Sequence, residues 1–270
     1  MKPADISCVI PTLNCAWCIG ETLQSIVGQV ESQARILVVD SESTDDTLKI
    51  CSQFGVEVVT EPRGNLYRAI NAGLRRCDTE WVAYTNADDP WYGDAHRRLL
   101  DTAREHKADL VYGSWDCIDH HGRFIYSFTP PAPEGLGALF RSAWMPFAQQ
   151  TVIFRRELFE RLGGFDTQYT MSADFDFFLR AYVQGARFVR AGGRPVGRWR
   201  LHSAQLSQQH AEAAEAQKRQ IVARAGLRAA ASDRLRLLGW RVSNWHNYLE
   251  RIVRSKQLRG GFSLPRALGS

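Results

Sequence analysis

The chain lacks the glycine-rich loops with which many nucleotide-binding folds hold phosphate groups. Its 21 glycines form no Gly-x-Gly-x-x-Gly pattern after an expected strand, and no Gly-x-x-x-x-Gly-Lys-Ser/Thr sequence occurs. Such loops bring backbone amides close to the phosphates at the start of a helix. A diphosphate bound by this chain would need its charge balanced in another way, and a metal ion held by carboxylates is the available means.

The sequence also lacks the cysteine pattern of a zinc site. Six cysteines are present, and the only close pair is Cys15-x-x-Cys18. A structural zinc site needs four ligands, which usually come as two such pairs. A redox role for the pair remains an alternative, because a Cys-x-x-Cys sequence at a helix start lowers the pKa of a thiol. We expect packed, reduced thiols, as in a cytoplasmic protein.

Long apolar runs are missing as well. No segment approaches the roughly 20 apolar residues that a membrane-spanning helix needs. Met1–Asp5 leads straight into an expected strand and lacks the apolar region of a signal peptide. We therefore expect a cytoplasmic protein that is either soluble or bound peripherally at the inner face of the cell membrane.

Positive charge is concentrated at the end of the chain. Residues 1–210 hold 22 Lys and Arg against 25 Asp and Glu, whereas residues 211–270 hold 12 against 4. We predict a main domain over 1–210 and a basic, helical C-terminal extension over 211–270. The simplest interpretation of the extension is a solvated set of helices, and contact with anionic membrane lipid is the alternative. Nucleic acid is not an expected partner, because the main domain carries no basic stripe.

Expected strands and helices alternate over the first ninety residues. Short apolar runs predict strands at 6–10, 35–39, 56–59 and 81–85, separated by expected helices at 19–30 and 66–76 and one ending at Phe54. This alternation predicts an α/β fold with a mostly parallel, doubly wound sheet flanked by helices. Further on, we expect strands at 109–113, 147–154 and 186–189, a hairpin over 114–128, a stiff loop at 130–133, and helices at 94–106, 155–162 and 174–184.

Short polar loops follow the expected strands, at Pro11–Asn14, Asp40–Thr44 and Asn86–Asp89. The carboxyl ends of parallel strands meet at one edge of a sheet, where open α/β sheets bind ligands. We therefore expect Asp40 and Asp88 to reach one cleft. Taken alone, Asp88-Asp89-Pro90 also suits a turn and a cap for the helix that follows, and Asp174 also suits a helix N-cap.

The ordered motifs of the chain resemble inverting family 2 glycosyltransferases with the GT-A fold. The resemblance runs from about Ile6 to Ser207 and rests on several segments in the family's order: 9–14 (Val-Ile-Pro-Thr-Leu-Asn), 38–47, Asn86-Ala87-Asp88-Asp89, 154–166 and 173–180. It implies a Rossmann-like central sheet and a metal-dependent sugar transfer from a nucleotide-diphosphate sugar of the UDP, GDP or dTDP type.

The resemblance also implies residue roles. Asp88 and His202 would hold Mn²⁺ or Mg²⁺, and Asp174 would be the general base. Asp40 would accept a hydrogen bond from the base of the nucleotide. The nucleotide-sugar site would comprise Pro11, Thr12, Asn14, Asp40, Asn65, Asn71, Asn86, Ala87 and Asp88.

Some positions depart from the family's pattern. The first aspartate of the Asp-x-Asp motif is Asn86, which brings less charge to a metal, and the acidic pair at the base is Ala173-Asp174. Related sequences often carry Asp and Gly where this chain has Arg63 and Asn65, in a loop that borders the nucleotide. These departures leave the donor open.

The expected reaction is transfer of the sugar to the hydroxyl of a saccharide or lipid-linked saccharide, with inversion, in surface polysaccharide, lipopolysaccharide or glycolipid biosynthesis. A catalytically inactive binding or scaffold subunit of the same fold is one alternative, motivated by Asn86. A sugar-phosphate nucleotidyltransferase is another, although Pro11–Asn14 offers no Gly-rich, basic loop for a triphosphate.

Overall fold

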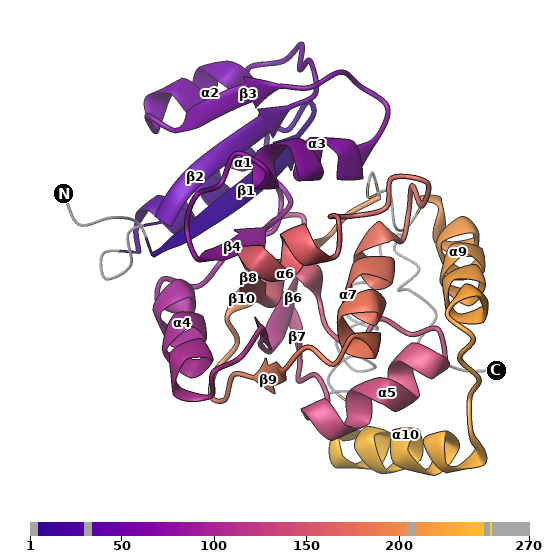
Figure 1. The fold of residues 1–270 in the computed structure, drawn as a ribbon. Helices are drawn as coiled ribbons and strands as arrows, with labels where there is room; N and C mark the ends of the chain where they lie inside the picture. Colours follow the sequence, from indigo (N-terminus) through magenta and orange to yellow (C-terminus); the bar gives the residue numbers. More distant parts are fainter. Residues whose placement is uncertain (1–4, 30–33, 204, 206–208, 246–248, 250–270) are drawn as a thin grey trace.

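A seven-stranded sheet lies at the centre of the protein (Figure 1). The structure, a computed structural model, describes residues 5–29, 34–203, 205, 209–245 and 249. The strand order is β3-β2-β1-β4-β8-β5-β9, in which β8 runs antiparallel to both neighbours and the other pairs are parallel. The strands are β1 (Ile6–Thr12), β2 (Ala34–Asp40), β3 (Glu57–Thr60), β4 (Trp81–Tyr84), β5 (Leu110–Tyr112), β8 (Val152–Arg155) and β9 (Phe188–Arg190).

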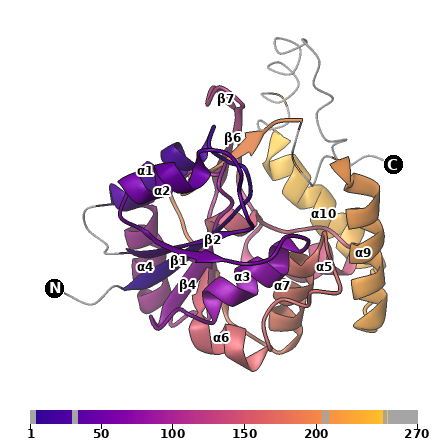
Figure 2. The ribbon, with the colours of Figure 1, turned by 90° about the horizontal axis from the view of Figure 1, so that it is seen from above.

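Helices cover both faces of this sheet, because side chains of its strands alternate between two apolar layers. Ile6, Cys8 and Ile10 of β1 pack on one face, whereas Val9 packs on the other. The first layer is covered by α1 (Ile19–Val27), α2 (Thr47–Gln53) and α4 (Ala95–Glu105). The second is covered by α3 (Leu66–Leu74), α5 (Pro133–Arg141), α6 (Arg156–Arg161) and α7 (Ala173–Val183), and Figure 2 shows the layers from above.

A smaller sheet has the order β10-β6-β7. It consists of β6 (Trp115–Asp119), β7 (Phe124–Phe128) and β10 (Gly197–Leu201). The predicted hairpin is present, since β6 and β7 pair antiparallel. Gly197 forms an isolated bridge with Trp91, so β10 runs beside the segment that follows β4. This pairing brings the end of β10 to the loop after β4.

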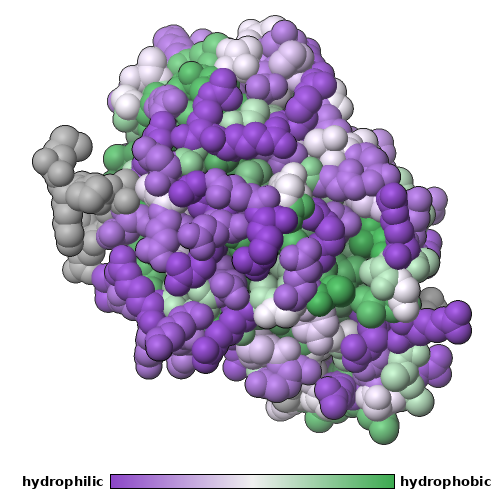
Figure 3. Space-filling model, in the orientation of Figure 1, coloured by the Kyte–Doolittle hydropathy of each residue, from purple (hydrophilic) through white to green (hydrophobic). Residues whose placement is uncertain are grey.

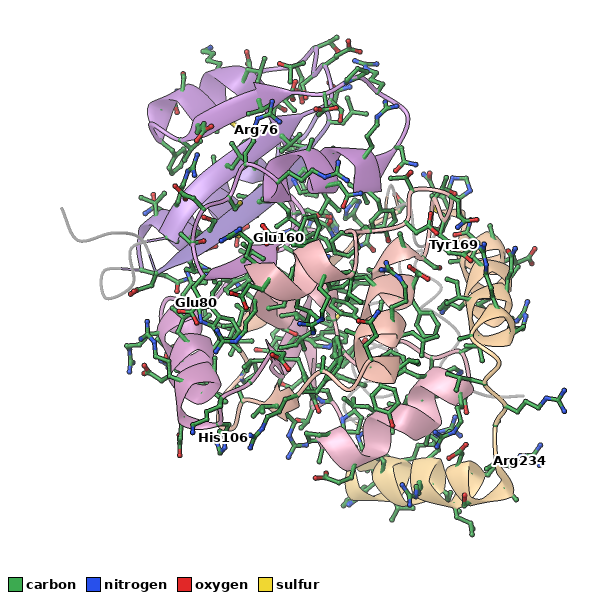
Figure 4. The ribbon with its side chains drawn as sticks, in the orientation of Figure 1. Arg76, Glu80, His106, Glu160, Tyr169 and Arg234 are labelled. Atoms are coloured by element: carbon green, nitrogen blue, oxygen red, sulfur yellow. The ribbon has the colours of Figure 1, made fainter. Side chains whose placement is uncertain are left out.

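The basic stretch after residue 210 contains two helices, α9 (Ala211–Arg224) and α10 (Ala231–Ser243). Ile221 and Val222 of α9 are buried in the same apolar cluster as α3 and α7. Arg224 donates to the hydroxyl of Tyr169, which Figure 4 labels beside α9, with a distance of 3.1 Å. α9 therefore packs on the rest of the protein, and α10 contacts α5. Among the described residues, no helix combines the length and the apolar character needed to cross a bilayer.

The structure departs from the sequence-based elements at two places. The segment expected to be a stiff loop at 130–133 leads into α5, whose first residue is Pro133. Proline suits the first helical position because its missing N–H would have no partner there. The expected strand 147–154 begins instead as a short 3₁₀ turn, Gln149–Thr151, before β8.

Candidate active site

The ends of β1, β2 and β4 lie side by side at one edge of the sheet, as predicted. Thr12 pairs with Asp40 in the β1–β2 register, and Tyr84 of β4 pairs with Val9 of β1. The loops that follow these strands therefore leave the sheet from the same edge. These strand ends and loops carry most of the predicted nucleotide residues and the predicted metal ligand Asp88, whereas His202 follows β10.

The loops after β1 and β2 are joined by a network of hydrogen bonds. Asn14 accepts from the amide of Thr44 (2.8 Å), and its own amide donates to the hydroxyl of Ser43 (2.9 Å). Asn14 has a φ of 53°, a left-handed conformation that asparagine adopts more readily than most residues. The Asp40 carboxylate accepts from the backbone amide of Ser43 at 2.9 Å and from its hydroxyl at 2.5 Å. Asp40 is buried, so the network fixes this carboxylate at the edge of the sheet.

Thr12 supplies a polar group to the same edge. Its hydroxyl is buried, and within the described part of the chain only the thiol of Cys15 helps to satisfy it. A hydrogen bond with Cys18 lowers the pKa of the Cys15 thiol to about 7, whereas burial raises the pKa of the Cys8 thiol. The six cysteines, all within the described residues, form no disulfide bond. Pro11 is buried beneath this loop. A polar ligand could therefore complete the hydrogen bonding of Thr12.

Asp88 meets His202 at the centre of the candidate site. The Asp88 Oδ2 atom lies 2.7 Å from His202 Nε2, and both side chains are largely buried, with 16% and 14% exposed. Asp88 comes from the loop after β4 and His202 from the residue after β10, so the structure brings together two predicted metal ligands that are 114 residues apart. Trp17, 55% exposed, packs edge-on against His202 with ring centroids 5.1 Å apart.

The neighbours of Asp88 have structural contacts. Asn86 donates its side-chain amide to Asp89 Oδ2 at 2.9 Å, and the Ala87 carbonyl accepts from Thr22 at 2.7 Å. Asp89 is fully buried and also accepts the backbone amide of Arg200 at 3.0 Å. Burial, and then the charge of Asp88, hold the pKa of the Asp89 carboxyl well above its usual range. The alternative of a helix cap is therefore wrong for Asp89, because α4 begins after Asp94.

Arg200 is a residue of this region that the sequence reasoning missed. Its guanidinium is 3% exposed, pairs with Glu21 of α1, and donates to the backbone carbonyls of Asp88 (3.1 Å) and His120 (3.2 Å). Arg200 thereby joins β10, α1, the turn between β6 and β7, and the loop that carries Asp88. One sequence pattern could have found it. In a strand, alternate residues lie on the same face, so Arg198, Arg200 and His202 share one face of β10 and its continuation.

The residues fit a divalent ion shared with a diphosphate. A carboxylate suits Mg²⁺ and Mn²⁺, and a neutral imidazole is a common metal ligand. No group of three or more His, Cys, Asp or Glu side chains suited to a metal occurs in the described part of the chain. Magnesium in phosphate-transfer sites is usually held by one or two carboxylates, with phosphate oxygens and water completing its shell. Asp88 and His202 match that kind of partial donor set.

Asp174, the predicted base, lies in the first turn of α7. The N-cap position belongs to Ser172, so the alternative of an N-cap role for Asp174 is wrong. Its Oδ1 atom accepts from the Tyr67 hydroxyl (3.0 Å) and from the amide of Phe175 (2.8 Å). In the described residues its Oδ2 atom has no hydrogen-bond partner. The carboxylate is therefore oriented through one oxygen and available through the other.

Burial raises the pKa of the Asp174 carboxyl, while the Phe175 amide, the Tyr67 hydroxyl and the charge of Lys218 oppose this rise. Lys218 comes from α9 and is half-buried. Burial lowers the pKa of its ammonium group, and the charge of Asp174 acts in the opposite sense. α9 is held there because Met171 donates its amide to Gln217 (2.9 Å) and Ser172 donates to the Ala214 carbonyl (3.0 Å). Sequence reasoning assigned no site residue to this helix.

The phenol of Tyr84, at the end of β4, links the two halves of the region electrostatically. Burial, followed by the charges of Asp174 and of the Tyr67 and Asp89 groups, raises the pKa of Tyr84. Tyr84 is therefore close enough to feel both the carboxylate of α7 and a carboxylate of the loop after β4. Tyr84 thus lies near both the candidate base and Asp89, the neighbour of Asp88.

Asn65 and Asn71 make contacts with the backbone of the segment that precedes α7. Asn65 caps α3 by accepting from the amides of Tyr67 and Arg68, and its side chain donates to the Thr167 carbonyl at 2.9 Å. The buried Asn71 side chain both donates to and accepts from the backbone of Phe165, at 2.8 and 2.9 Å. In this structure both amides tether α3 to the segment that precedes α7, and a nucleotide contact for them stays a prediction.

Comparison with known proteins gives a sequence match over much of the chain. Residues 7–163 match the profile of "Glycosyl transferase family 2". A PGL/p-HBAD biosynthesis glycosyltransferase of Mycobacterium bovis (strain BCG / Pasteur) is 30% identical over 202 residues, which cover 70% of this chain and 74% of that protein. The same identity and coverage hold for a PGL/p-HBAD biosynthesis glycosyltransferase of Mycobacterium tuberculosis.

Solved structures share the fold. The crystal structure of S. aureus TarS 1-349 in complex with UDP is 21% identical, with a TM-score of 0.63 over 82% of this chain and 70% of that chain. Mannosyltransferase PcManGT from Pyrobaculum calidifontis, in complex with GDP-Man and Mn²⁺, is 20% identical, with a TM-score of 0.58 over 95% and 85%. The predicted GT-A fold is confirmed by these neighbours.

Proposed function

The chain belongs to glycosyl transferase family 2, and from this membership we propose that it moves a sugar from a nucleotide-diphosphate sugar to an acceptor hydroxyl with inversion at the anomeric carbon. The observation that carries the proposal is the meeting of Asp88 and His202 at 2.7 Å, at the edge of the sheet where the predicted nucleotide loops also end. A second carboxylate, Asp174, lies in the first turn of α7, where its Oδ1 atom accepts from the Tyr67 hydroxyl at 3.0 Å.

The proposed chemistry assigns one role to each carboxylate. An acceptor hydroxyl is a weak nucleophile, and Asp174 would take its proton through Oδ2 as the new bond forms, which is worth roughly 10²–10⁴-fold in rate. The Tyr67 hydroxyl and the Phe175 amide hold Oδ1, so the second oxygen keeps a fixed direction. A single displacement, with the base on the face opposite the leaving group, gives inversion.

The leaving diphosphate needs its developing charge balanced. Asp88 and His202 would hold Mn²⁺ or Mg²⁺, which when bound acts as a Lewis acid toward the diphosphate. Arg200 keeps the backbone around Asp88 in place through its carbonyl contacts. The buried Asp40, the Thr12 hydroxyl and the loop of Asn14 would then contact the nucleoside.

The partners follow from the same assignment. Structures of the fold neighbours contain UDP, UDP-GlcNAc or GDP-Man, which supports a donor of the UDP, GDP or dTDP type for this chain. We propose a saccharide or lipid-linked saccharide as the acceptor, in surface polysaccharide, lipopolysaccharide or glycolipid biosynthesis. The proposed location is the cytoplasm, with peripheral contact to the inner face of the membrane through residues 211–270.

The test is a nucleotide-sugar turnover assay with Mn²⁺ or Mg²⁺, run on wild type, Asp174→Ala and Asp88→Ala. We expect wild type to release nucleoside diphosphate from at least one UDP, GDP or dTDP sugar when acceptor is supplied. Asp174→Ala should lose transfer by at least about a hundredfold, the lower range of general-base catalysis, yet still bind the donor. Asp88→Ala should lose both transfer and metal-dependent donor binding.

The same experiment also tests the alternative that the protein is a catalytically inactive binding or scaffold subunit, which the residue at position 86 motivates. Asn86 is a neutral amide that brings no charge to a metal, and its side-chain N–H donates to Asp89. If wild type binds nucleoside diphosphates but turns over no sugar nucleotide with either metal, the protein is a binding subunit. If none of the UDP, GDP or dTDP nucleotides raises the Tm of wild type in a thermal-shift experiment, the nucleotide site itself is refuted.

A further inference from the structure

α10 exposes a row of large apolar side chains. Leu235, Leu238 and Val242 are 72%, 57% and 62% exposed, and Trp245, just beyond the helix, is 60% exposed. Their spacing of three and four residues places them on one side of the helix. Single exposed apolar residues are common on protein surfaces, whereas a continuous row marks a site of interaction. We call these four residues the α10 stripe.

The opposite side of α10 is fastened to the protein. Asp233 forms a two-point ion pair with Arg141 of α5, at 2.6 and 2.8 Å. Trp240 packs against Phe128 with ring centroids 5.6 Å apart. These contacts hold the helix along α5, at the lower edge of the ribbon in Figure 1. The α10 stripe therefore faces outward because the other side of the helix is already engaged.

Positive charge borders the stripe. Arg234 lies four residues before Leu238 and so beside it, is exposed, and is labelled near the start of α10 in Figure 4. Arg228, just before α10, is exposed as well, whereas Arg236 lies on the docked side of the helix and donates to the Glu134 carbonyl of α5 at 3.4 Å. The only carboxylate of α10 is Asp233, which is 1% exposed and paired with Arg141. Figure 3 shows hydrophobic residues next to hydrophilic ones at the lower edge of the molecule, where α10 lies.

We propose that α10 docks on an anionic lipid bilayer, with the α10 stripe in the interfacial region and the arginines at the headgroups. A helix that combines an apolar side with Arg, and that carries a Trp, has the character of an interfacial anchor. Each Arg near an anionic surface strengthens binding by about fivefold. The inference rests on the peripheral contact in the proposed function, to which it gives a surface and a lipid class.

A second copy of the chain fits this surface less well. Two copies that met through the same stripe would bring Arg234 and its neighbours toward the same residues of the partner copy. Like charges across an interface are unfavourable, and the described part of α10 offers no free carboxylate to relieve them. Charge complementarity therefore favours the bilayer.

The test is sedimentation of the full chain with vesicles of phosphatidylcholine alone or with one third phosphatidylglycerol. We expect binding to the anionic vesicles that weakens several-fold when salt is raised, and weak binding to the neutral ones. The double variant Leu238→Ser/Val242→Ser should bind at least about tenfold more weakly, because it loses the apolar area that insertion of two large side chains removes from water. Arg234→Glu should also weaken binding to the anionic vesicles.

Val183→Ser is the matched control, since Val183 is 56% exposed at the end of α7 and lies outside the stripe. It should bind like wild type, and all variants should keep the wild-type Tm because the changed side chains are exposed. Absent binding to anionic vesicles, or binding that the double variant retains, overturns the proposal. A dimer in ultracentrifugation that the double variant abolishes would instead identify a second copy as the occupant. No step of the test requires sugar transfer, so its failure and that of the proposed function are distinct.

Discussion

Tyr67→Phe removes one hydroxyl from the candidate base and should change the pH dependence of transfer. The Tyr67 hydroxyl donates to Asp174 Oδ1 at 3.0 Å, and the ring is buried against Phe165, so phenylalanine can occupy the same space. The carboxylate needs this hydrogen bond more than the neutral acid does. Without it, the pKa of Asp174, which burial already raises, should rise further.

The size of the effect follows from hydrogen-bond energies. A hydrogen bond to a charged group contributes about 1.5–3 kcal/mol and one to a neutral group about 0.5–1.5 kcal/mol. The difference of about 1–1.5 kcal/mol changes the ratio of carboxylate to acid by roughly five- to tenfold. Since a general base must be deprotonated, kcat/KM on the acidic limb of the pH profile should fall by about that factor.

The assay is kcat/KM for nucleotide-sugar turnover as a function of pH. On the alkaline plateau Asp174 is ionised in both proteins, so the variant should lose much less there. Tyr92→Phe is the matched control, because the Tyr92 hydroxyl also donates to a carboxylate, that of Asp116, at 2.5 Å. An active Tyr67→Phe enzyme whose acidic limb coincides with that of wild type would refute the assignment of Asp174 as the base.

Three further predictions concern the same region. Lys218→Met should move the acidic limb of the pH profile to higher pH, as Tyr67→Phe does, because the charge of Lys218 favours the ionised form of Asp174. Lys218→Arg should restore the wild-type limb. A limb that Lys218→Met leaves in place would show that α9 does not change the pKa of the base. Asp174→Asn should raise the Tm at pH 7–8, by about 2–4 °C for each kcal/mol relieved. Burial disfavours the ionised carboxyl of Asp174, so the native protein loses stability at pH values above the folded pKa and loses none below the unfolded pKa near 3.9. The Tm values of wild type and Asp174→Asn should therefore converge as the pH falls toward 4. Equal Tm values at pH 8 would contradict a raised pKa of Asp174. Iodoacetamide at pH 7 should modify Cys15 before the other cysteines, because the pKa of its thiol is about 7 and the other cysteines are buried. Mass spectrometry of wild type and Cys15→Ser checks the order of modification. Bound nucleoside diphosphate should slow the modification of Cys15.

Much of the fold could be predicted from residue patterns, because the apolar runs that became β1, β2 and β4 are buried along their whole length or nearly so. Parallel pairing of the strands was enough to predict that Asp40 and Asp88 lie at the same edge of the sheet. α5 was missed because Pro133 was interpreted as part of a loop, although it occupies the first position of a helix.

The candidate site was less accessible to sequence reasoning. The roles of Asp88, His202 and Asp174 came from the family resemblance, and their surroundings came only from the structure. Arg200 was missed because several of its partners are backbone carbonyls, which leave no trace in the sequence. Lys218 was missed because it lies beyond the resemblance and reaches the site only through the packing of α9 on α7.

The two asparagine tethers of α3 bear on how this enzyme could be re-engineered. Asn65 and Asn71 fasten the donor-side half to the segment before α7, yet their partners there are backbone atoms of Phe165 and Thr167. Any relative with the same backbone path offers those atoms whatever its side chains are. Chimeras that combine the part of this chain through α3 with the later part of a relative should therefore keep their junction intact. Under the proposed function, such chimeras would let donor and acceptor preferences be exchanged independently.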